Sequence, residues 1–173
     1  LLPGGVEAGL RETVFWTPET LQAPDDQDRV NTSAAYGFVF DICGLIVDPD
    51  TGSVSVDQYI TAHDAGRLLN PALANGQIRG AFAQGVGAAL FEEFRYSEDG
   101  NFQSGTLAEY LMPTACEIPD PTIVHLETPS PFTPLGAKGL AEGNNMSTPV
   151  AIANAFADAL RRQQKNADDI RLP

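Results

Sequence analysis

The sequence has few of the residues that nucleic-acid-binding and membrane-spanning proteins need. Lysine and arginine together number 10 against 23 aspartates and glutamates, and the formal net charge is −13. Proteins that bind nucleic acid contact phosphates through clustered basic side chains, so this charge balance excludes that class of partner. No apolar run approaches the roughly 18 residues of a membrane span, and the sequence therefore predicts no such span.

Cysteine is also scarce, with two residues in the whole chain. Cys43 and Cys116 have neither a second cysteine at CxxC spacing nor a histidine at the spacing of a metal site. The chain therefore cannot by itself hold an iron–sulfur cluster or a zinc ion. Because free cysteine is among the most often buried residue types, we expect two buried thiols, while a disulfide between them stays open.

An initiator methionine and the pattern of a signal peptide are both missing from the start of the chain. We therefore expect the chain to be part of something longer. The 173 residues, with 43% hydrophobic and 19% charged, suit one medium globular domain. Turn-rich composition predicts an irregular segment over residues 1–34, with a short strand at Thr13–Trp16, before a globular part over residues 35–173.

Strand patterns are concentrated in the first half of the globular part. Aromatic and β-branched residues over Tyr36–Val47, the turn residues Asp48–Gly52 and a second apolar run from Val54 onwards predict a β-hairpin. Ile123–Leu126 is a further strand candidate, in which His125 is expected to point outward. Thr106–Met112 reads as a short apolar strand or helix, ended by a proline.

Two segments have the apolar periodicity of a helix. Residues 73–94 carry one apolar face, made of Ile78, Ala81, Phe82, Gly85, Val86, Ala89 and Leu90. In the second segment Thr148 is the expected N-cap, Pro149 the first helical residue, and Val150, Ala153, Phe156, Ala157 and Leu160 the apolar face. Together the elements predict an α+β fold, with a mixed or antiparallel sheet and two principal helices packed on it.

The first predicted helix has a second face that contains glycine and glutamine. Gln77, Gly80, Gln84 and Gly87 lie on it, although each glycine costs roughly 1 kcal/mol of helix stability relative to alanine. Either tight packing of the helix on the sheet or a ligand would explain these glycines, and the residues alone leave both open.

A glycine-punctuated loop with one lysine and one glutamate precedes the second helix. Glycines let a backbone approach a ligand closely, and polar ligands bind readily near a helix N-terminus. Lys138 and Glu142 are therefore candidates for a functional site. The alternative is an ordinary surface loop whose charges are solvated.

These motifs also carry a resemblance. Several spaced motifs resemble the last part of the large subunit of molybdenum hydroxylases of the xanthine oxidase family. In chain order they are Asp48–Gly52, His63–Arg67, Gly76–Gly85, and Lys138–Gly143 followed by the Pro149–Ala155 helix. Glu109–Pro113 and Glu127–Phe132 are similar to the bacterial carbon-monoxide-dehydrogenase-like branch. Ala141 departs from the family, which often has glycine there, and so do Asn144, Asn145 and Met146.

The resemblance implies that residues 1–173 are a C-terminal, molybdenum-cofactor-binding segment of such a subunit. It implies a cytoplasmic enzyme, active only with partner chains, that oxidises an N-heterocycle or an aldehyde at an electron-poor carbon. The cofactor would be molybdopterin cytosine dinucleotide, shared with another chain or segment. FAD and [2Fe-2S] clusters would lie on partner chains, and the remaining part of the molybdenum subunit would complete the pocket.

Residue by residue, the resemblance makes Glu142 the catalytic base. It implies cofactor contacts from the residues that match its turn and helix motifs, namely Gln84, Gly85, Lys138, Gly139, Leu140, Ala141, Asp64 and Asn70. No residue of the chain is expected to bind the metal directly. Two alternatives stay open: a non-catalytic docking or scaffold subunit that kept the fold, and a carbon-monoxide-oxidising relative.

Overall fold

The computed structural model describes residues 11–163, 165 and 167. The chain divides between Ala34 and Ala35 into two compact units. In the described part of the first unit, Gln22 and Asn31 form an isolated antiparallel bridge around a turn, in which the Asp25 carboxylate accepts from the backbone N–H groups of Gln27 and Arg29. The strand expected at Thr13–Trp16 is wrong: these residues are irregular, and Phe15 is 93% exposed.

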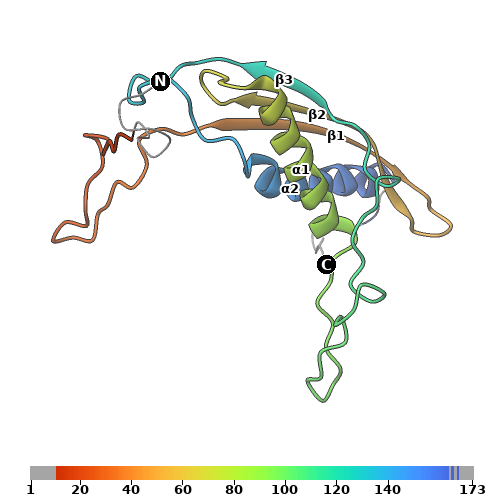
Figure 1. The fold of residues 1–173 in the computed structure, drawn as a ribbon. Helices are drawn as coiled ribbons and strands as arrows, with labels where there is room; N and C mark the ends of the chain where they lie inside the picture. Colours follow the sequence, from red (N-terminus) through yellow and green to blue (C-terminus); the bar gives the residue numbers. More distant parts are fainter. Residues whose placement is uncertain (1–10, 164, 166, 168–173) are drawn as a thin grey trace, which may run out of the picture. The chain divides into compact units, whose positions relative to one another are not determined.

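The second unit is built on a three-stranded sheet with the order β1-β2-β3 (Figure 1). The predicted hairpin is confirmed: β1 (Phe38–Val47) pairs antiparallel with β2 (Val54–Asp64), with a bulge between Gly44 and Leu45. Gly52 takes a positive φ in the turn that joins them, as the sequence predicts. The strand β3 (Thr122–Leu126) pairs parallel with β2, so the sheet is mixed.

Helix α1 (Pro71–Leu90) begins two residues before the predicted start and ends four residues before the predicted end. The Asn70 side chain accepts from the Leu73 N–H and caps the helix, and Pro71 occupies the first turn, where no N–H is needed. Its predicted apolar face is confirmed, because Ile78, Ala81, Phe82, Gly85, Val86 and Ala89 are all buried. The fold is therefore α+β, as expected.

Helix α2 (Gly143–Arg162) corrects two predictions. It begins directly after Glu142, so Pro149 lies inside the helix and Thr148 is not its N-cap. Thr148 is fully buried, and its hydroxyl is 2.9 Å from the Tyr59 hydroxyl of β2. The predicted apolar face is wrong at Val150, which is 58% exposed, because the buried stripe passes through Asn144, Thr148 and Ile152 instead.

Both helices lie against the same face of the sheet (Figure 1). Between the helices and the sheet, Tyr59 and Phe82 pack with their ring centroids 4.3 Å apart. Around this pair the core gathers Val56, Val86, Ala89 and Ile152. None of the helices in the described part of the chain is long and apolar enough to cross a bilayer.

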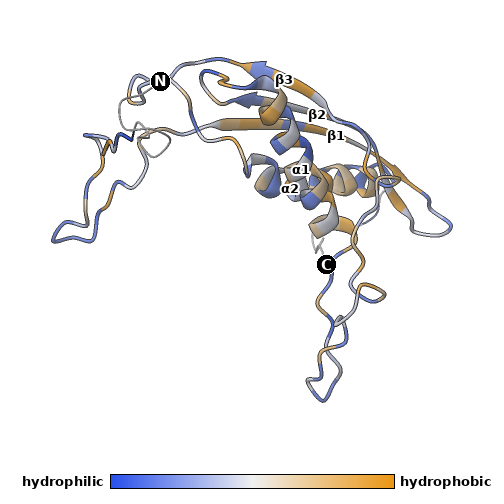
Figure 2. Cartoon of the chain, viewed as in Figure 1, coloured by the Kyte–Doolittle hydropathy of each residue, from blue (hydrophilic) through white to orange (hydrophobic). Residues whose placement is uncertain are grey.

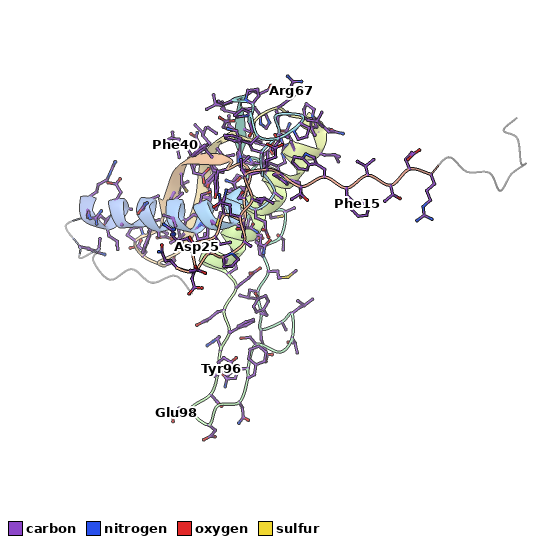
Figure 3. The ribbon with its side chains drawn as sticks, turned by 90° about the vertical axis from the view of Figure 1, so that its left-hand side faces the viewer. Phe15, Asp25, Phe40, Arg67, Tyr96 and Glu98 are labelled. Carbon is purple, nitrogen blue, oxygen red and sulfur yellow. The ribbon has the colours of Figure 1, made fainter. Side chains whose placement is uncertain are left out.

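The opposite face of the sheet is largely apolar, and no helix or strand of the described residues packs on it. Strand alternation places large hydrophobic side chains on it, and in the described chain they stay between 38% and 66% exposed. Figure 2 shows the apolar colouring along β1, and Figure 3 shows Phe40 projecting from this strand. We call this surface the outer sheet face; it consists of Phe38, Phe40, Ile42, Ile46, Ile60, Val124 and Leu126.

The segment between α1 and β3 is a long loop with Tyr96 and Glu98 at its far end (Figure 3). The prediction of a strand or helix at Thr106–Met112 is wrong, because these residues form turns. Both cysteines are free, as expected, but only Cys43 is partly buried and Cys116 is exposed. Burial raises the pKa of the Cys43 thiol to about 11.

His125 on β3 does not point outward as expected. Its Nε2 atom is 2.7 Å from the Asn75 Oδ1 atom of α1, so the ring faces the helices. The expectation assumed that the apolar residues on either side of His125 face the core. In this strand those residues, Val124 and Leu126, belong to the outer sheet face.

Candidate functional site

Glu142 lies where the glycine-rich loop enters α2. Its side chain is exposed and does not cap the helix. It lines a groove of about 830 Å³ between the start of β1, the loop residues 139–142 and the first turns of α2. The walls of the groove are largely apolar and include Tyr36, Val39, Leu140, Met146 and Val150.

The backbone around Glu142 has little room to move. A Cβ atom added at Gly143 would come within 2.6 Å of the Val39 side chain, so α2 begins in direct contact with β1. Asn144 follows and is fully buried, and its side chain is hydrogen-bonded to residues of β1 and β2. The Glu142 turn is therefore fixed on its helical side by packing and by hydrogen bonds.

Asn144, His63 and Asp41 form a polar cluster that the sequence did not reveal. The His63 Nε2 atom lies 2.8 Å from Asn144 Oδ1, and Asn144 Nδ2 donates to Asp41 and, at 3.1 Å, to Thr61 Oγ1. Burial lowers the pKa of His63, which keeps the ring neutral at neutral pH. The period of two in β2 was a signal for it, since Tyr59, Thr61 and His63 share one buried face.

The neighbouring residue Asp64 lies on the other face of the strand from His63, because adjacent residues of a strand point to opposite faces. Asp64 instead forms an ion pair with Lys138, whose Nζ atom lies 3.1 Å from Oδ1 while the two side chains are 12% and 8% exposed. The same carboxylate accepts from the N–H groups of Gly66 and Thr128. Hydrogen bonds led by that of the Thr128 side chain hold the pKa of Asp64 well below its usual range.

Gln84 and Gly85 lie next to each other on α1 but have different surroundings. A Cβ atom at Gly85 would come within 2.7 Å of the Thr148 Cβ atom, so this glycine allows the close crossing of α1 and α2. Gln84 is exposed, and its Oε1 atom accepts from Asn145 Nδ2 at 3.2 Å. Asn145 is three residues beyond Glu142, so Gln84 is linked to the Glu142 turn through one side chain.

Eight of the nine predicted site residues thus fall into three groups. Gly139, Leu140, Ala141 and Glu142 line the groove; Gln84 and Gly85 lie at the crossing of the helices; and Asp64 and Lys138 pair behind the loop. Asn70 caps α1 and is not among the residues that line the groove. Within the described residues, no group of three or more histidine, cysteine or acidic side chains could hold a metal ion.

The family model of the molybdopterin cofactor-binding domain matches residues 5–119 of the chain. The chain belongs to this family. Over 91% of its length it is 35% identical to the nicotine 6-hydroxylase large subunit of Paenarthrobacter nicotinovorans, of which it covers 18%. The chain thus spans about a fifth of that relative.

Two solved structures are similar to this molybdopterin cofactor-binding chain. Quinoline 2-oxidoreductase from Pseudomonas putida 86 is 40% identical, with a TM-score of 0.67 over 69% of this chain and 15% of that one. A Cu,Mo-containing carbon monoxide dehydrogenase is 31% identical, with a TM-score of 0.75 over 79% of this chain and 17% of that one. The resemblance to molybdenum hydroxylases drawn from the sequence is confirmed.

Proposed function

We propose that this molybdopterin-binding chain is part of a molybdenum-dependent hydroxylase or dehydrogenase in which Glu142 is the catalytic base. The observation that carries the proposal is an exposed carboxylate on a rigidly held turn at the side of an apolar groove. A general base must be held where it can reach the proton that it removes. The family match supports the cofactor, while Glu142 itself lies beyond the matched residues 5–119.

The residues present fit the reactive end of a molybdopterin cofactor. The Asn145 Oδ1 atom is buried without a hydrogen-bond partner among the described residues, and the Gln84 amide lies exposed beside it. A pterin ring has donors and acceptors that would satisfy both amides. Among the described residues, neither lysine nor arginine lines the groove, so the anionic phosphates of a dinucleotide would need further contacts in the subunit.

The chemistry divides between the cofactor and the chain. When bound, the molybdenum cofactor supplies oxygen transfer and accepts two electrons from the substrate. Glu142 accepts a proton at its carboxylate as an oxygen nucleophile attacks an electron-poor carbon. Leu140, Met146 and Val150 bind the apolar body of the substrate and exclude water from it.

The lining of the groove and the names of two relatives support an N-heterocycle or an aldehyde as substrate. A groove of about 830 Å³ with aromatic and aliphatic walls suits a planar ring. Two of the similar proteins are named for action on the N-heterocycles nicotine and quinoline. The proposal is tested by the molybdenum content of the purified complex and by the turnover of a Glu142→Gln variant.

The remaining parts of the enzyme are proposed on partner chains. Two cysteines cannot ligate a [2Fe-2S] cluster, so the clusters and the FAD that carry electrons away would lie elsewhere. The word subunit in the name of the nicotine-hydroxylating relative supports a heteromeric complex. The cytosine dinucleotide form of the cofactor and a cytoplasmic location stay predictions from the resemblance.

Gln84→Ala is expected to lower the molybdenum content of the purified complex several-fold while changing its thermal stability little. Gln84 is exposed and its side chain bonds to Asn145, so its loss would remove the proposed cofactor contact and little packing. Molybdenum per chain, measured by elemental analysis beside a melting curve, checks this. Gln77→Ala, an exposed glutamine two turns earlier on α1, serves as the control. Full molybdenum content in Gln84→Ala would contradict the assignment.

Ile42→Asp is expected to destabilise the assembled subunit by about 2 kcal/mol or more, the value of burying one large apolar side chain. We propose that the outer sheet face packs against the rest of a full-length molybdenum-binding subunit, since this chain spans 18% of the nicotine-hydroxylating relative. Chemical denaturation of the assembled subunit measures the loss, and Ile42→Leu is the apolar control. Equal stability of the two variants would show that this face stays in water.

A further inference from the structure

The first turn of α2 carries an uncharged polar residue that is completely buried. Asn144 is 0% exposed, two residues after the exposed Glu142. A buried amide is costly unless its hydrogen bonds are made. Here the amide bonds to three side chains, namely His63 and Thr61 of β2 and Asp41 of β1.

The chemistry of the partners allows one orientation of this amide. An ionised carboxylate only accepts hydrogen bonds, so Asn144 must turn its Nδ2 atom toward Asp41, 3.2 Å away. Its Oδ1 atom then faces His63 at 2.8 Å, and the His63 Nε2 atom must carry the proton and donate it. The cluster therefore has a fixed direction, from His63 through Asn144 to Asp41.

The geometry joins this cluster directly to the Glu142 turn. Gly143, the one residue between Glu142 and Asn144, is pressed against Val39, as a Cβ atom there would lie 2.6 Å from the valine side chain. Val39 and Asp41 are two residues apart on β1 and face His63 and Thr61 in the register of the sheet. The Glu142 turn is thus held against both strands of the hairpin at two successive residues.

A second buried hydrogen bond lies one helical turn further along α2. Thr148 and Tyr59 join their hydroxyl groups at 2.9 Å, and the Tyr59 ring also packs on Phe82 in the core. This bond holds the helix to the same strand, but it lies six residues beyond Glu142. Thr148 therefore offers a matched comparison for effects on stability alone.

We propose that Asn144 is a positioning residue, which with His63 and Asp41 sets the direction in which Glu142 projects into the groove. The inference rests on the proposed role of Glu142 and deepens it. Asn144 makes no contact with substrate in this arrangement; it acts through the backbone of Gly143. Displacement of a catalytic group by about 1 Å costs on the order of 10²-fold in rate, so a cluster that fixes this backbone controls turnover.

The test compares Asn144→Asp with Thr148→Val in the assembled enzyme. Asn144→Asp keeps the size of the side chain but opposes a second carboxylate to Asp41. It should lower kcat by about 10²-fold with KM nearly unchanged, and it should raise amide hydrogen exchange in a peptide covering residues 139–146. Thr148→Val should lower the melting temperature through the loss of one buried hydrogen bond and leave kcat within about twofold. Equal losses of kcat in the two variants would overturn the proposal.

The swapped pair, Asn144→Asp with Asp41→Asn, guards against simple misfolding. It restores one amide and one carboxylate at the two positions with no change in net charge, so their hydrogen bond forms again in the opposite sense. Most of the lost kcat and the slow amide exchange should return. If the double variant shows slow amide hydrogen exchange in residues 139–146 but its kcat stays as low as that of Asn144→Asp, the positioning role is overturned.

A Glu142→Gln background separates this inference from the proposed function. Asn144→Asp should add little to the loss of kcat once the carboxylate of Glu142 has been removed, since residues that act as a unit are not additive. A slow Glu142→Gln enzyme with a normal Asn144→Asp enzyme refutes the positioning role alone. Normal turnover of Glu142→Gln refutes the proposed base, and the exchange experiment still reports whether Asn144 holds the turn.

Discussion

Glu142→Gln is expected to reduce substrate oxidation by about 10²–10⁴-fold, the usual contribution of a positioned acid or base. Glutamine keeps the size and hydrogen-bonding shape of the side chain but cannot accept the proton. The loss should appear mainly in kcat, because the interaction strengthens in the transition state. Steady-state kinetics on enzyme matched for molybdenum content measure it.

Stability and cofactor binding should change little in this variant. Glu142 is exposed and does not cap α2, so its substitution should alter the free energy of unfolding by no more than about 0.5 kcal/mol. Glu98→Gln, at the far end of the loop between α1 and β3, is the control and should retain normal turnover (Figure 3). Near-normal kcat in Glu142→Gln would show that Glu142 is not the base and is an ordinary solvated charge of a surface loop.

Lys138→Met is expected to destabilise the chain by about 3–5 kcal/mol, as for loss of one partner of a buried ion pair. The substitution keeps the length of the side chain and leaves the Asp64 carboxylate, 12% exposed, without its cation. The resemblance makes Lys138 a cofactor contact, whereas the structure gives its ammonium group a partner within the chain. Chemical denaturation measures the contribution of Lys138 to stability. Molybdenum content, compared at an equal fraction of folded protein, measures its contribution to cofactor binding.

The exposed ion pair between Arg79 and Asp120 provides the control. Its atoms approach to 2.6 Å, but the two side chains are 47% and 73% exposed, and solvent screens such pairs strongly. Arg79→Met should therefore lose far less stability than Lys138→Met. Equal losses of stability in the two variants would show that the buried ion pair of Lys138 stabilises the chain no more than an exposed one.

Acid titration tests the contribution of the Asp64 carboxylate to stability in a second way. The folded pKa of Asp64 is lowered, so the stability it contributes is present above its unfolded pKa of about 3.9. That contribution is lost as pH falls below this value toward the folded pKa. Asp64→Asn should accordingly lose stability at neutral pH and show a flatter decline below about pH 4.

Local patterns predicted the sheet and the first helix well. The hairpin was predictable because Asp48–Gly52 has the chemistry of a tight turn and the flanking residues favour strands. The apolar face of α1 was predictable because a helix buried on one side repeats its apolar residues at a period of 3.6. Both signals depend on residues close together in the sequence.

The start of α2 was not predictable from the same rules. Thr148 and Pro149 match a helix N-terminus locally, but tertiary contacts determine the boundary. The Thr148 hydroxyl bonds to Tyr59, which is 89 residues away in the sequence. Nearly two further helical turns therefore form before the proline, and the first of them brings Asn144 to the polar cluster. The strand predicted at Thr13–Trp16 fails because these residues have no partner strand in the part of the chain that the structure describes.

The site was predictable in its residue types more than in its contacts. Glu142 and residues 139–141 line one groove, as a glycine-rich loop before a helix indicates. The pairing of Lys138 with Asp64 and the cluster around Asn144 join residues more than 70 positions apart. Such contacts depend on the register of β1, β2 and β3, which no short motif encodes.

The most direct test of the account is the molybdenum and nucleotide content of the purified complex that contains this chain. The account predicts about one molybdenum per chain, together with cytidine monophosphate released from the cofactor by acid hydrolysis, since a cofactor carries the redox chemistry. Molybdenum without cytidine monophosphate would correct the form of the cofactor only. Absence of molybdenum from a folded, fully assembled complex would contradict the central claim and favour a non-catalytic subunit.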